Sequence, residues 1–264
     1  MIIAIANTIS NNNVKASSVD PDASAFFSRV TAAGGTLTTT EQTAVDTLVK
    51  SMKATGTWAG MKAIYPMVGS SAAACAQNLK SSSFTGTFSS GWTFSSLGVT
   101  GNGTSSVFDT TLIPSVSLSQ NNTSVSYYIR NNYNLELRDI ICTGSGSSYI
   151  GSYITTNKEV AVNDGFAPVV TPTKKNGLFT FSRILSTQSK TYCNNLQTFT
   201  NTVTSNTPNI FAIKAGALNI SGSLSRYMTN TLSLIHIADG LTDTQASDLY
   251  NSVQTFQTTL SRQV

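Results

Sequence analysis

Hydrophobic and polar residues alternate near the C-terminus and predict a strand followed by a helix. Residues 231–238 alternate between one strongly apolar face and one mixed face, which is the pattern of a strand. Asp239-Gly240 has the composition of a turn that ends this strand. Thr242 and Gln245 are spaced as a capping box, so we expect a helix over about 242–261. Its apolar residues recur at spacings of three and four, at Ala246, Leu249, Tyr250, Val253, Phe256 and Leu260.

The N-terminal part of the chain predicts a flexible arm and then a small helical unit. Residues 1–20 begin apolar and become rich in asparagine and serine, which is typical of an arm that is ordered only when it docks. Residues 21–66 predict two helices, the first opening at Asp20-Pro21 and the second at the capping box of Thr38 and Glu41. The spacing of Trp58, Met61 and Ile64 predicts a third, shorter helical turn that Pro66 ends. This helical prefix is too small to bury its apolar faces alone, so we expect it to pack on the rest of the chain.

From residue 77 onward the pattern changes to that of a β domain. Short runs with period-two alternation succeed one another every 8 to 12 residues or so, separated by Gly, Asn, Ser and Pro. About a dozen such strands indicate a mainly β fold, a two-sheet jelly-roll sandwich over residues 77–264 that ends in the C-terminal helix. No repeat of fixed period is visible, which argues against a propeller or a solenoid.

The amino-acid composition argues against a disordered chain, a nucleic-acid-binding protein and a membrane-spanning protein. Charged residues are 11% and hydrophobic residues 40%, a combination that differs from that of disordered chains. The net charge of +4 reflects scarce carboxylates rather than abundant Lys and Arg. The basic residues are scattered along the chain, so we do not expect nucleic acid as a partner. No apolar run is long enough to span a membrane. Three widely spaced cysteines suggest buried packing residues rather than a disulfide framework or a metal site, and a chance pair is the alternative.

Candidate catalytic and metal-binding residues are few. His236 is the only histidine, and we expect it to be held within the sheet rather than to act in a triad, since no Gly-x-Ser-x-Gly motif nominates a serine. The carboxylates of the β body form no paired pattern along a strand, so we expect no enzyme activity. Cofactors are expected to be absent. A single weak calcium site from Asp109, Asp164 and Asp239 is the alternative to their role in turns.

Aromatic side chains offer a binding surface. Tyrosine rings beside Asn and Asp suit sugar recognition, because rings stack on the apolar faces of sugars while amides bond their hydroxyl groups. Core packing is expected to use at least half of the aromatic residues of the β body. The candidates for glycan binding are Tyr128, Tyr133, Tyr149 and Tyr153.

Several stretches at both ends of the chain are similar to a group of bacteriophage virion proteins. They are residues 20–27 (DPDASAFF), 61–69 (MKAIYPMVG), 78–80 (NLK), 91–96 (GWTFSS), 101–103 (GNG), 238–246 (ADGLTDTQA) and 256–264 (FQTTLSRQV). The group occurs mainly in phages of Bacteroidetes hosts, and its β body resembles the concanavalin A or laminin-G type of jelly roll. The resemblance implies a virion appendage, such as a fibre, a spike or a capsid-surface protein, and it carries over no catalytic residue.

These observations predict a virion surface protein that binds host polysaccharide. Its expected partners are other virion proteins and, since virion appendages often form symmetric oligomers, further copies of itself. A capsid or cementing protein that binds no ligand is the first alternative. A polysaccharide depolymerase is the second.

Overall fold

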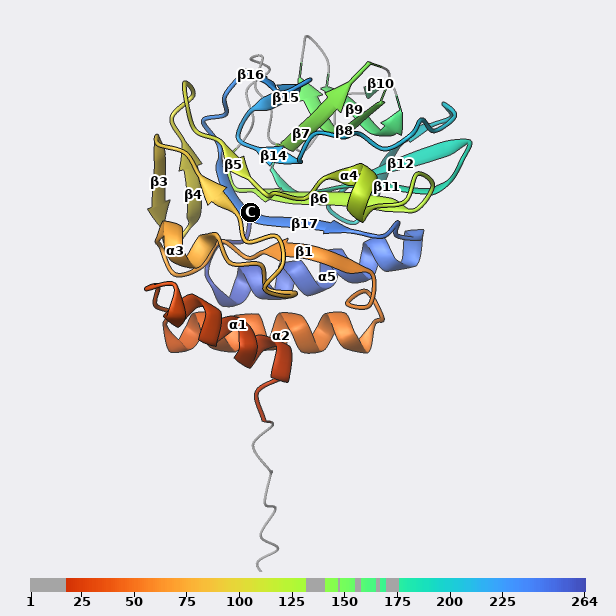
Figure 1. Ribbon diagram of the computed structural model, residues 1–264. Helices are drawn as coiled ribbons and strands as arrows, with labels where there is room; N and C mark the ends of the chain where they lie inside the picture. Colours follow the sequence, from red (N-terminus) through yellow and green to blue (C-terminus); the bar gives the residue numbers. More distant parts are fainter. Residues whose placement is uncertain (1–17, 132–140, 147, 155–157, 165–166, 170–175) are drawn as a thin grey trace, which may run out of the picture.

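The protein is a β sandwich covered on one side by helices, as the computed structural model shows (Figure 1). The structure describes residues 18–131, 141–146, 148–154, 158–164, 167–169 and 176–264, without the side chains of 153, 154, 158–160 and 167–169. The predicted arm, residues 1–17, therefore lies outside the described residues. Two sheets and a layer of helices are stacked, and the sheet nearer the helices is called the inner sheet here.

The inner sheet contains eight strands among the described residues. Its order is β13-β12-β11-β6-β17-β4-β3, and β1 also pairs with β17. Strand β4 pairs with the first residues of β17, and β1 pairs with its last four. The strands are β1 (Met61–Tyr65), β3 (Trp92–Ser95), β4 (Gly98–Gly101), β6 (Thr123–Ile129), β11 (Gly177–Leu185), β12 (Gln188–Cys193), β13 (Leu196–Asn201) and β17 (Thr231–Ala238).

The outer sheet contains nine strands of the described chain. Its order is β10-β9-β8-β7-β14-β5-β2, and β15 pairs with both β7 and β16. The strands are β2 (Thr87–Phe88), β5 (Phe108–Asp109), β7 (Ile141–Ser145), β8 (Ser148–Ile154), β9 (Lys158–Asp164), β10 (Ala167–Val169), β14 (Lys214–Ala215), β15 (Leu218–Ile220) and β16 (Ser223–Ser225). The mainly β, two-sheet jelly-roll fold predicted from the sequence is confirmed.

The helical layer covers the inner sheet. It consists of α1 (Pro21–Ala32), α2 (Thr39–Ala54) and α5 (Asp243–Thr259), with α5 between α2 and the sheet in the view of Figure 1. Two short helices, α3 (Ala72–Cys75) and α4 (Pro114–Ser117), lie in connections. Asp20 is the N-cap of α1, and α2 has the predicted capping box of Thr38 and Glu41. No helix among the described residues is long and apolar enough to cross a membrane.

Two apolar layers result from this arrangement. One lies between the sheets and includes Tyr127, Phe179 and Ile235. The other lies between the inner sheet and the helices and includes Tyr128 and Leu249. Neighbouring residues of β6 thus point into different cores, and every residue of that strand is buried. The three cysteines are also buried and form no disulfide, as the sequence predicts.

The third helical turn predicted around Trp58, Met61 and Ile64 is wrong. Residues 61–65 form strand β1, which pairs antiparallel with the end of β17. The apolar spacing resembled that of a helix because Met61 and Ile64 both face the helical layer, across a register shift between Met61 and Ala63. The predicted helical prefix therefore contributes a strand to the sandwich.

The side chain of Arg262 is fully buried and links the C-terminal segment to two other parts of the chain. The guanidinium donates to the carbonyl oxygens of Met67 (2.8 Å), Pro66 (3.0 Å) and Ser233 (3.1 Å), and to Oε1 of Gln257 (2.8 Å). Burial lowers its pKa to about 10. These hydrogen bonds join the segment after α5 to the connection after β1 and to β17.

The capping box of α5 predicts a measurable loss of stability when it is removed. The Thr242 hydroxyl accepts from the backbone N–H of Gln245 (3.3 Å), and the Gln245 side chain accepts from the Thr242 N–H (3.0 Å). We expect Thr242→Ala to lower the free energy of unfolding by about 1 kcal/mol, because one N-terminal N–H loses its acceptor. Urea unfolding measures this, with Thr244→Ala, an exposed position within the helix, as the control. Equal losses for the two variants would contradict the role of the cap.

Candidate functional site

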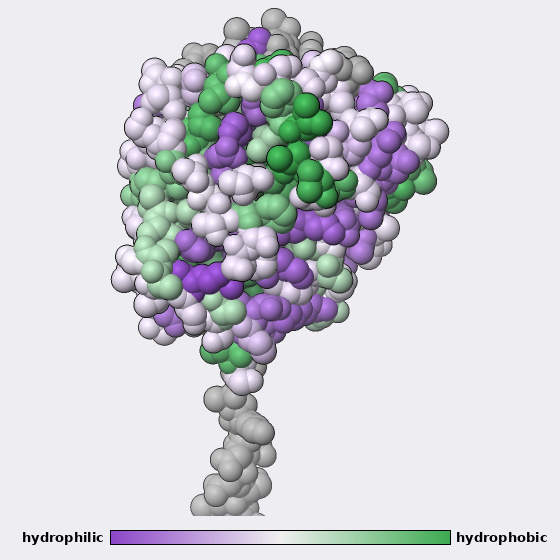
Figure 2. All heavy atoms as spheres, viewed as in Figure 1, coloured by the Kyte–Doolittle hydropathy of each residue, from purple (hydrophilic) through white to green (hydrophobic). Residues whose placement is uncertain are grey.

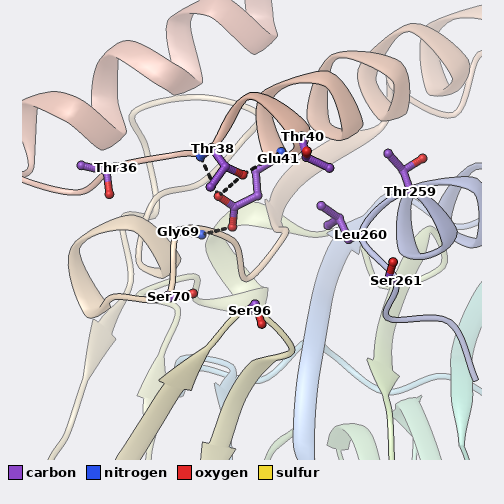
Figure 3. A pocket seen from close by; sticks show the side chains of 10 residues that line it. All are labelled: Thr36, Thr38, Thr40, Glu41, Gly69, Ser70, Ser96, Thr259, Leu260 and Ser261. Carbon is purple, nitrogen blue, oxygen red and sulfur yellow. Dashed lines mark hydrogen bonds between the residues drawn. The ribbon is translucent and has the colours of Figure 1, made fainter.

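A hollow lined by hydroxyl groups lies where four segments meet (Figure 3). Its volume is about 360 Å³, and we call it the hydroxyl pocket. The segments are the start of α2, the connection after β1, the turn between β3 and β4, and the end of α5. The lining residues are Thr36, Thr38, Thr40, Glu41, Gly69, Ser70, Ser96, Thr259, Leu260 and Ser261.

Glu41 is the single carboxylate in the lining of the hydroxyl pocket, and its oxygens accept hydrogen bonds from the protein itself. Oε2 of Glu41 accepts from the N–H (2.8 Å) and the hydroxyl (2.9 Å) of Thr38, and Oε1 accepts from the N–H of Gly69 (2.7 Å). Glu41 thereby joins the start of α2 to the connection after β1 (Figure 3). The described lining of this pocket has no aromatic ring, side-chain amide or cation. We therefore interpret the hydroxyl pocket as a gap between packed segments rather than as a recognition site.

A second hollow combines more kinds of polar group, and we call it the hairpin cleft. Its volume is about 330 Å³. The β12–β13 hairpin forms one side and the first turn of α5 forms the other. The lining residues are Tyr192, Asn194, Asn195, Gln197, Asp243, Ala246 and Ser247.

Asp243 is a fixed anion in the hairpin cleft. Lys190 Nζ lies 2.7 Å from Oδ1 and 2.8 Å from Oδ2, and the Tyr192 hydroxyl donates to Oδ1 (2.6 Å). These hydrogen bonds, first from Lys190 and then from Tyr192, lower the pKa of Asp243. Burial, together with the bond to Asp243, raises the pKa of the Tyr192 phenol. The side chain of Asp243 is nevertheless 63% exposed, so a ligand can reach it.

The turn of the hairpin presents amides and an aliphatic side chain beside this anion. Asn195 and Gln197 are exposed, and Leu196 between them is 68% exposed. Asn194 has a positive φ of 55°, and its Oδ1 accepts from the N–H of Leu178 (2.9 Å), which fixes the turn. Amides and a carboxylate can bond adjacent hydroxyl groups, while Leu196 can contact a C–H surface. The cleft thus has the chemistry to bind an uncharged, hydroxyl-rich molecule.

Of the four tyrosines predicted from the sequence, the structure describes the side chains of Tyr128 and Tyr149, which lie in different sheets. Tyr128 is fully buried under the helical layer and offers no ring face to a sugar, because the inner sheet is covered on both sides. Tyr133 lies outside the described residues, and so does the side chain of Tyr153 in β8. Tyr149 is half-buried, and its hydroxyl donates to the carbonyl oxygen of Gly146 (2.9 Å). A Cβ on Gly144 would lie 1.9 Å from the Tyr149 ring, so the ring rests on that glycine.

His236 lies within the inner sheet, as expected, but its ring is not satisfied there. The side chain is fully buried, and neither ring nitrogen has a hydrogen-bond partner among the described residues. Burial lowers its pKa to about 3. The imidazole is therefore neutral, and it lines none of the hollows described above.

Asp164 ends β9, and residues 165–166, which would complete the predicted turn, lie outside the described residues. Its carboxylate forms an ion pair with Arg183, and both side chains are fully buried. The other two candidate calcium ligands are also paired, Asp109 with Lys214 and Asp239 with Lys62. Among the described residues, no three His, Cys, Asp or Glu side chains are grouped as metal ligands.

Sequence reasoning did not single out the hairpin cleft. Its two sides are about fifty residues apart in the chain, and no spacing relates Tyr192 to Asp243. The available signals were the Asn194-Asn195 pair, which is typical of a turn, and Asp243 in the first turn of a predicted helix.

Comparisons with known proteins indicate the fold. A scan against models of protein families finds no match, and a comparison with curated proteins finds none. Among solved structures, domain 4 of AbnA, an extracellular arabinanase of Geobacillus stearothermophilus in complex with arabinotriose, is 15% identical with a TM-score of 0.51. A mutant of Trypanosoma rangeli sialidase that displays trans-sialidase activity is 9% identical (TM-score 0.54), and a mutant of HCR/D is 11% identical (TM-score 0.53).

The similarity extends differently over these structures. It covers 72% of this chain and 98% of the arabinanase domain. It covers 80% of this chain but 39% of the sialidase, and 74% of this chain but 52% of HCR/D. The protein is thus a jelly-roll sandwich of the kind found in domains of glycosidases, and at these identities the similarity defines the fold alone.

Proposed function

We propose that this protein is a non-enzymatic carbohydrate-binding protein displayed on the surface of a bacteriophage particle. The hairpin cleft is its glycan site. The observation that carries this proposal is the combination of a fixed carboxylate at the start of α5 with exposed amides and an exposed leucine on the facing hairpin. Neutral sugars have the matching chemistry, since their hydroxyl groups pair with amides and carboxylates while their C–H faces contact apolar side chains.

The class of ligand has further support. The arabinanase domain that shares the architecture is in complex with arabinotriose, so a sandwich of this kind can carry a sugar site. A non-enzymatic role is supported by the state of the carboxylate in the cleft. Asp243 is paired with Lys190, which lowers its pKa and disfavours the protonated acid that glycoside hydrolysis requires.

The place on a phage particle rests on the sequence resemblance at both ends of the chain. It predicts other virion proteins as partners, several copies in a symmetric assembly and a host-surface polysaccharide as ligand. Cryo-electron microscopy of the intact particle tests this part, because it reports both location and copy number. A capsid position with the hairpin cleft covered by neighbouring subunits would favour the cementing alternative.

Removal of the cleft amides is expected to weaken glycan binding. A glycan array and host capsular polysaccharides identify a ligand, and titration calorimetry then compares the variants. Asn195→Ala and Gln197→Ala should each weaken binding about 3- to 10-fold, since one hydrogen bond contributes about 1 kcal/mol. Asn251→Ala, an exposed asparagine farther along α5, is the matched control and should bind as the wild type does.

Two outcomes would overturn the proposal. Absence of binding to every host glycan, with tight binding to purified capsids, would favour a cementing protein. Oligosaccharides released from capsular polysaccharide during incubation with the protein would show a depolymerase instead.

A further inference from the structure

A third hollow lies at the end of the β7–β8 hairpin, on the outer sheet, and we call it the serine notch. Its volume is about 380 Å³. The hairpin contributes one side, and the segment that leads from β13 to β14 contributes the other. The lining residues are Ser145, Ser148, Asn206, Thr207, Pro208, Asn209 and Ile210, of which none is charged.

The amide of Asn209 is fully engaged and gives the notch a fixed wall. Asn209 is 3% exposed. Its Nδ2 donates to Oγ of Ser145 (3.0 Å) and to the carbonyl oxygen of Ser148 (3.2 Å), and its Oδ1 accepts from the N–H of Phe211 (2.8 Å). These hydrogen bonds hold the segment between β13 and β14 against the β7–β8 hairpin. A ligand in the notch would not have to break them.

The hydroxyl of Ser148 takes no part in these hydrogen bonds. The residue is 8% exposed, and its hydroxyl is buried without a hydrogen-bond partner among the described residues. A buried hydroxyl that makes no hydrogen bond is unfavourable, so such a group needs an explanation. Its position in the lining of an uncharged hollow indicates a neutral ligand that supplies a donor or an acceptor.

Ile210 gives the notch an exposed aliphatic side chain. It is 67% exposed, and Val116 on the neighbouring α4 is 79% exposed. A hydrogen bond from the N–H of Ser115 to the carbonyl oxygen of Asn209 (2.9 Å) holds α4 against the same segment. Figure 2 shows hydrophobic surface in the upper half of the molecule, over the region where Figure 1 places α4 and β14. Branched aliphatic side chains without an aromatic ring favour contact with a methyl group.

We propose that the serine notch binds a neutral sugar that carries a methyl group, either in an acetamido substituent or as a 6-deoxy sugar. The hydroxyl of Ser148 would bond an amide or a hydroxyl group of the sugar, and Ile210 with Pro208 would contact its methyl group. This inference rests on the proposed function only in taking a carbohydrate as the ligand. The notch is lined by residues that do not overlap with those of the hairpin cleft.

The test uses the whole protein with N-acetylglucosamine, L-fucose and glucose as probes, monitored by NMR titration. N-acetylglucosamine or fucose should bind, and glucose, which has no methyl group, should bind at least tenfold more weakly. Ser148→Ala should weaken binding about 3- to 10-fold without lowering the melting temperature, because the hydroxyl makes no hydrogen bond to the described residues. Ile210→Ser should also weaken binding, and Ile184→Ser, an exposed isoleucine on β11, should not.

The outcomes separate the two sites. Equal affinity of Ser148→Ala and the wild type would overturn the inference, and so would a lower melting temperature, which would mean that the hydroxyl is already satisfied. Loss of binding in Asn195→Ala alone would place the sugar in the hairpin cleft and remove the notch. Loss in Ser148→Ala alone would support the notch and remove the cleft.

Discussion

Asp164→Asn is expected to lower the free energy of unfolding by about 3–5 kcal/mol, the range for a buried ion pair that loses one partner. The substitution keeps the shape of the side chain and removes its charge. Arg183 would then remain buried as a cation without its anion. Urea unfolding followed by circular dichroism measures the change, which should also appear as a clear fall in the melting temperature.

The contacts of the pair explain why the effect should be large. The Asp164 carboxylate accepts from the N–H of Val162 (2.8 Å), Nδ2 of Asn201 (2.9 Å) and Oγ of Ser189 (3.2 Å), besides Arg183. The guanidinium also donates to four carbonyl oxygens, those of Val162, Leu185, Ser186 and Val203. Asp164 ends β9 of the outer sheet, while its side-chain partners belong to β11, β12 and β13 of the inner sheet. The pair therefore joins the two sheets at one edge of the sandwich.

Two further variants test whether the loss comes from leaving the charge of Arg183 buried and unpaired. Lys62→Met removes one partner of a half-buried pair with Asp239 at the surface, and we expect a loss below about 1 kcal/mol. The double variant Asp164→Asn with Arg183→Met should recover part of the loss, because no buried charge is left unpaired. A loss below about 1 kcal/mol for Asp164→Asn alone would mean that water reaches the carboxylate.

Locally encoded elements could be predicted from the sequence. The strand β17, the turn after it and the capping box of α5 depend on residues within a few positions of one another, and all three are confirmed. The starts of α1 and α2 were predicted for the same reason. The mainly β class came from alternation repeated over many short runs, which tolerates errors in any one of them.

Features that depend on distant residues could not be predicted. Residues 61–65 have apolar spacing compatible with a helical turn, and their pairing with β17, about 170 residues later, decides the outcome. Asp164 precedes a glycine and so has the composition of a turn, whereas its partners Arg183, Ser189 and Asn201 are 19 to 37 residues away. Both cases need the sheet order, which alternation does not specify.

The candidate site was hard to predict for a related reason. Alternation separates the two faces of a strand, but it does not tell which face meets water. Tyr127 and Tyr128 lie on opposite faces of β6. Tyr127 is buried between the two sheets, and Tyr128 is buried because the helical layer covers what would otherwise be the open face. The hairpin cleft, by contrast, combines residues of a hairpin with the first turn of a helix, and neither composition alone indicates a ligand.

Acid is expected to destabilise the protein through His236. The imidazole lies on the face of β17 that the helical layer covers, in register with Ser126 of β6, whose hydroxyl also lacks a partner among the described residues. Burial lowers the pKa of His236 to about 3 in the folded protein, while an unfolded chain titrates near 6.5. Between pH 6.5 and pH 3, the unfolded state therefore binds a proton at His236 that the folded state does not bind. The contribution of the neutral imidazole is complete above pH 6.5 and is lost as the pH falls from 6.5 towards 3.

The expected loss between pH 7 and pH 4 is about 3 kcal/mol, since each unit of pKa difference corresponds to about 1.4 kcal/mol. His236→Leu should remove this part of the pH dependence and keep or raise the stability at pH 7, because no unpaired polar group is then buried. Urea unfolding of both proteins at pH 7, 5.5 and 4 measures the difference. Parallel curves for wild type and variant would show that the ring is protonated in the folded protein, with water or a side chain stabilising the charge. A loss of stability below pH 6.5 that is about 3 kcal/mol larger in the wild type than in the variant would identify His236 as the residue responsible for this part of the acid sensitivity.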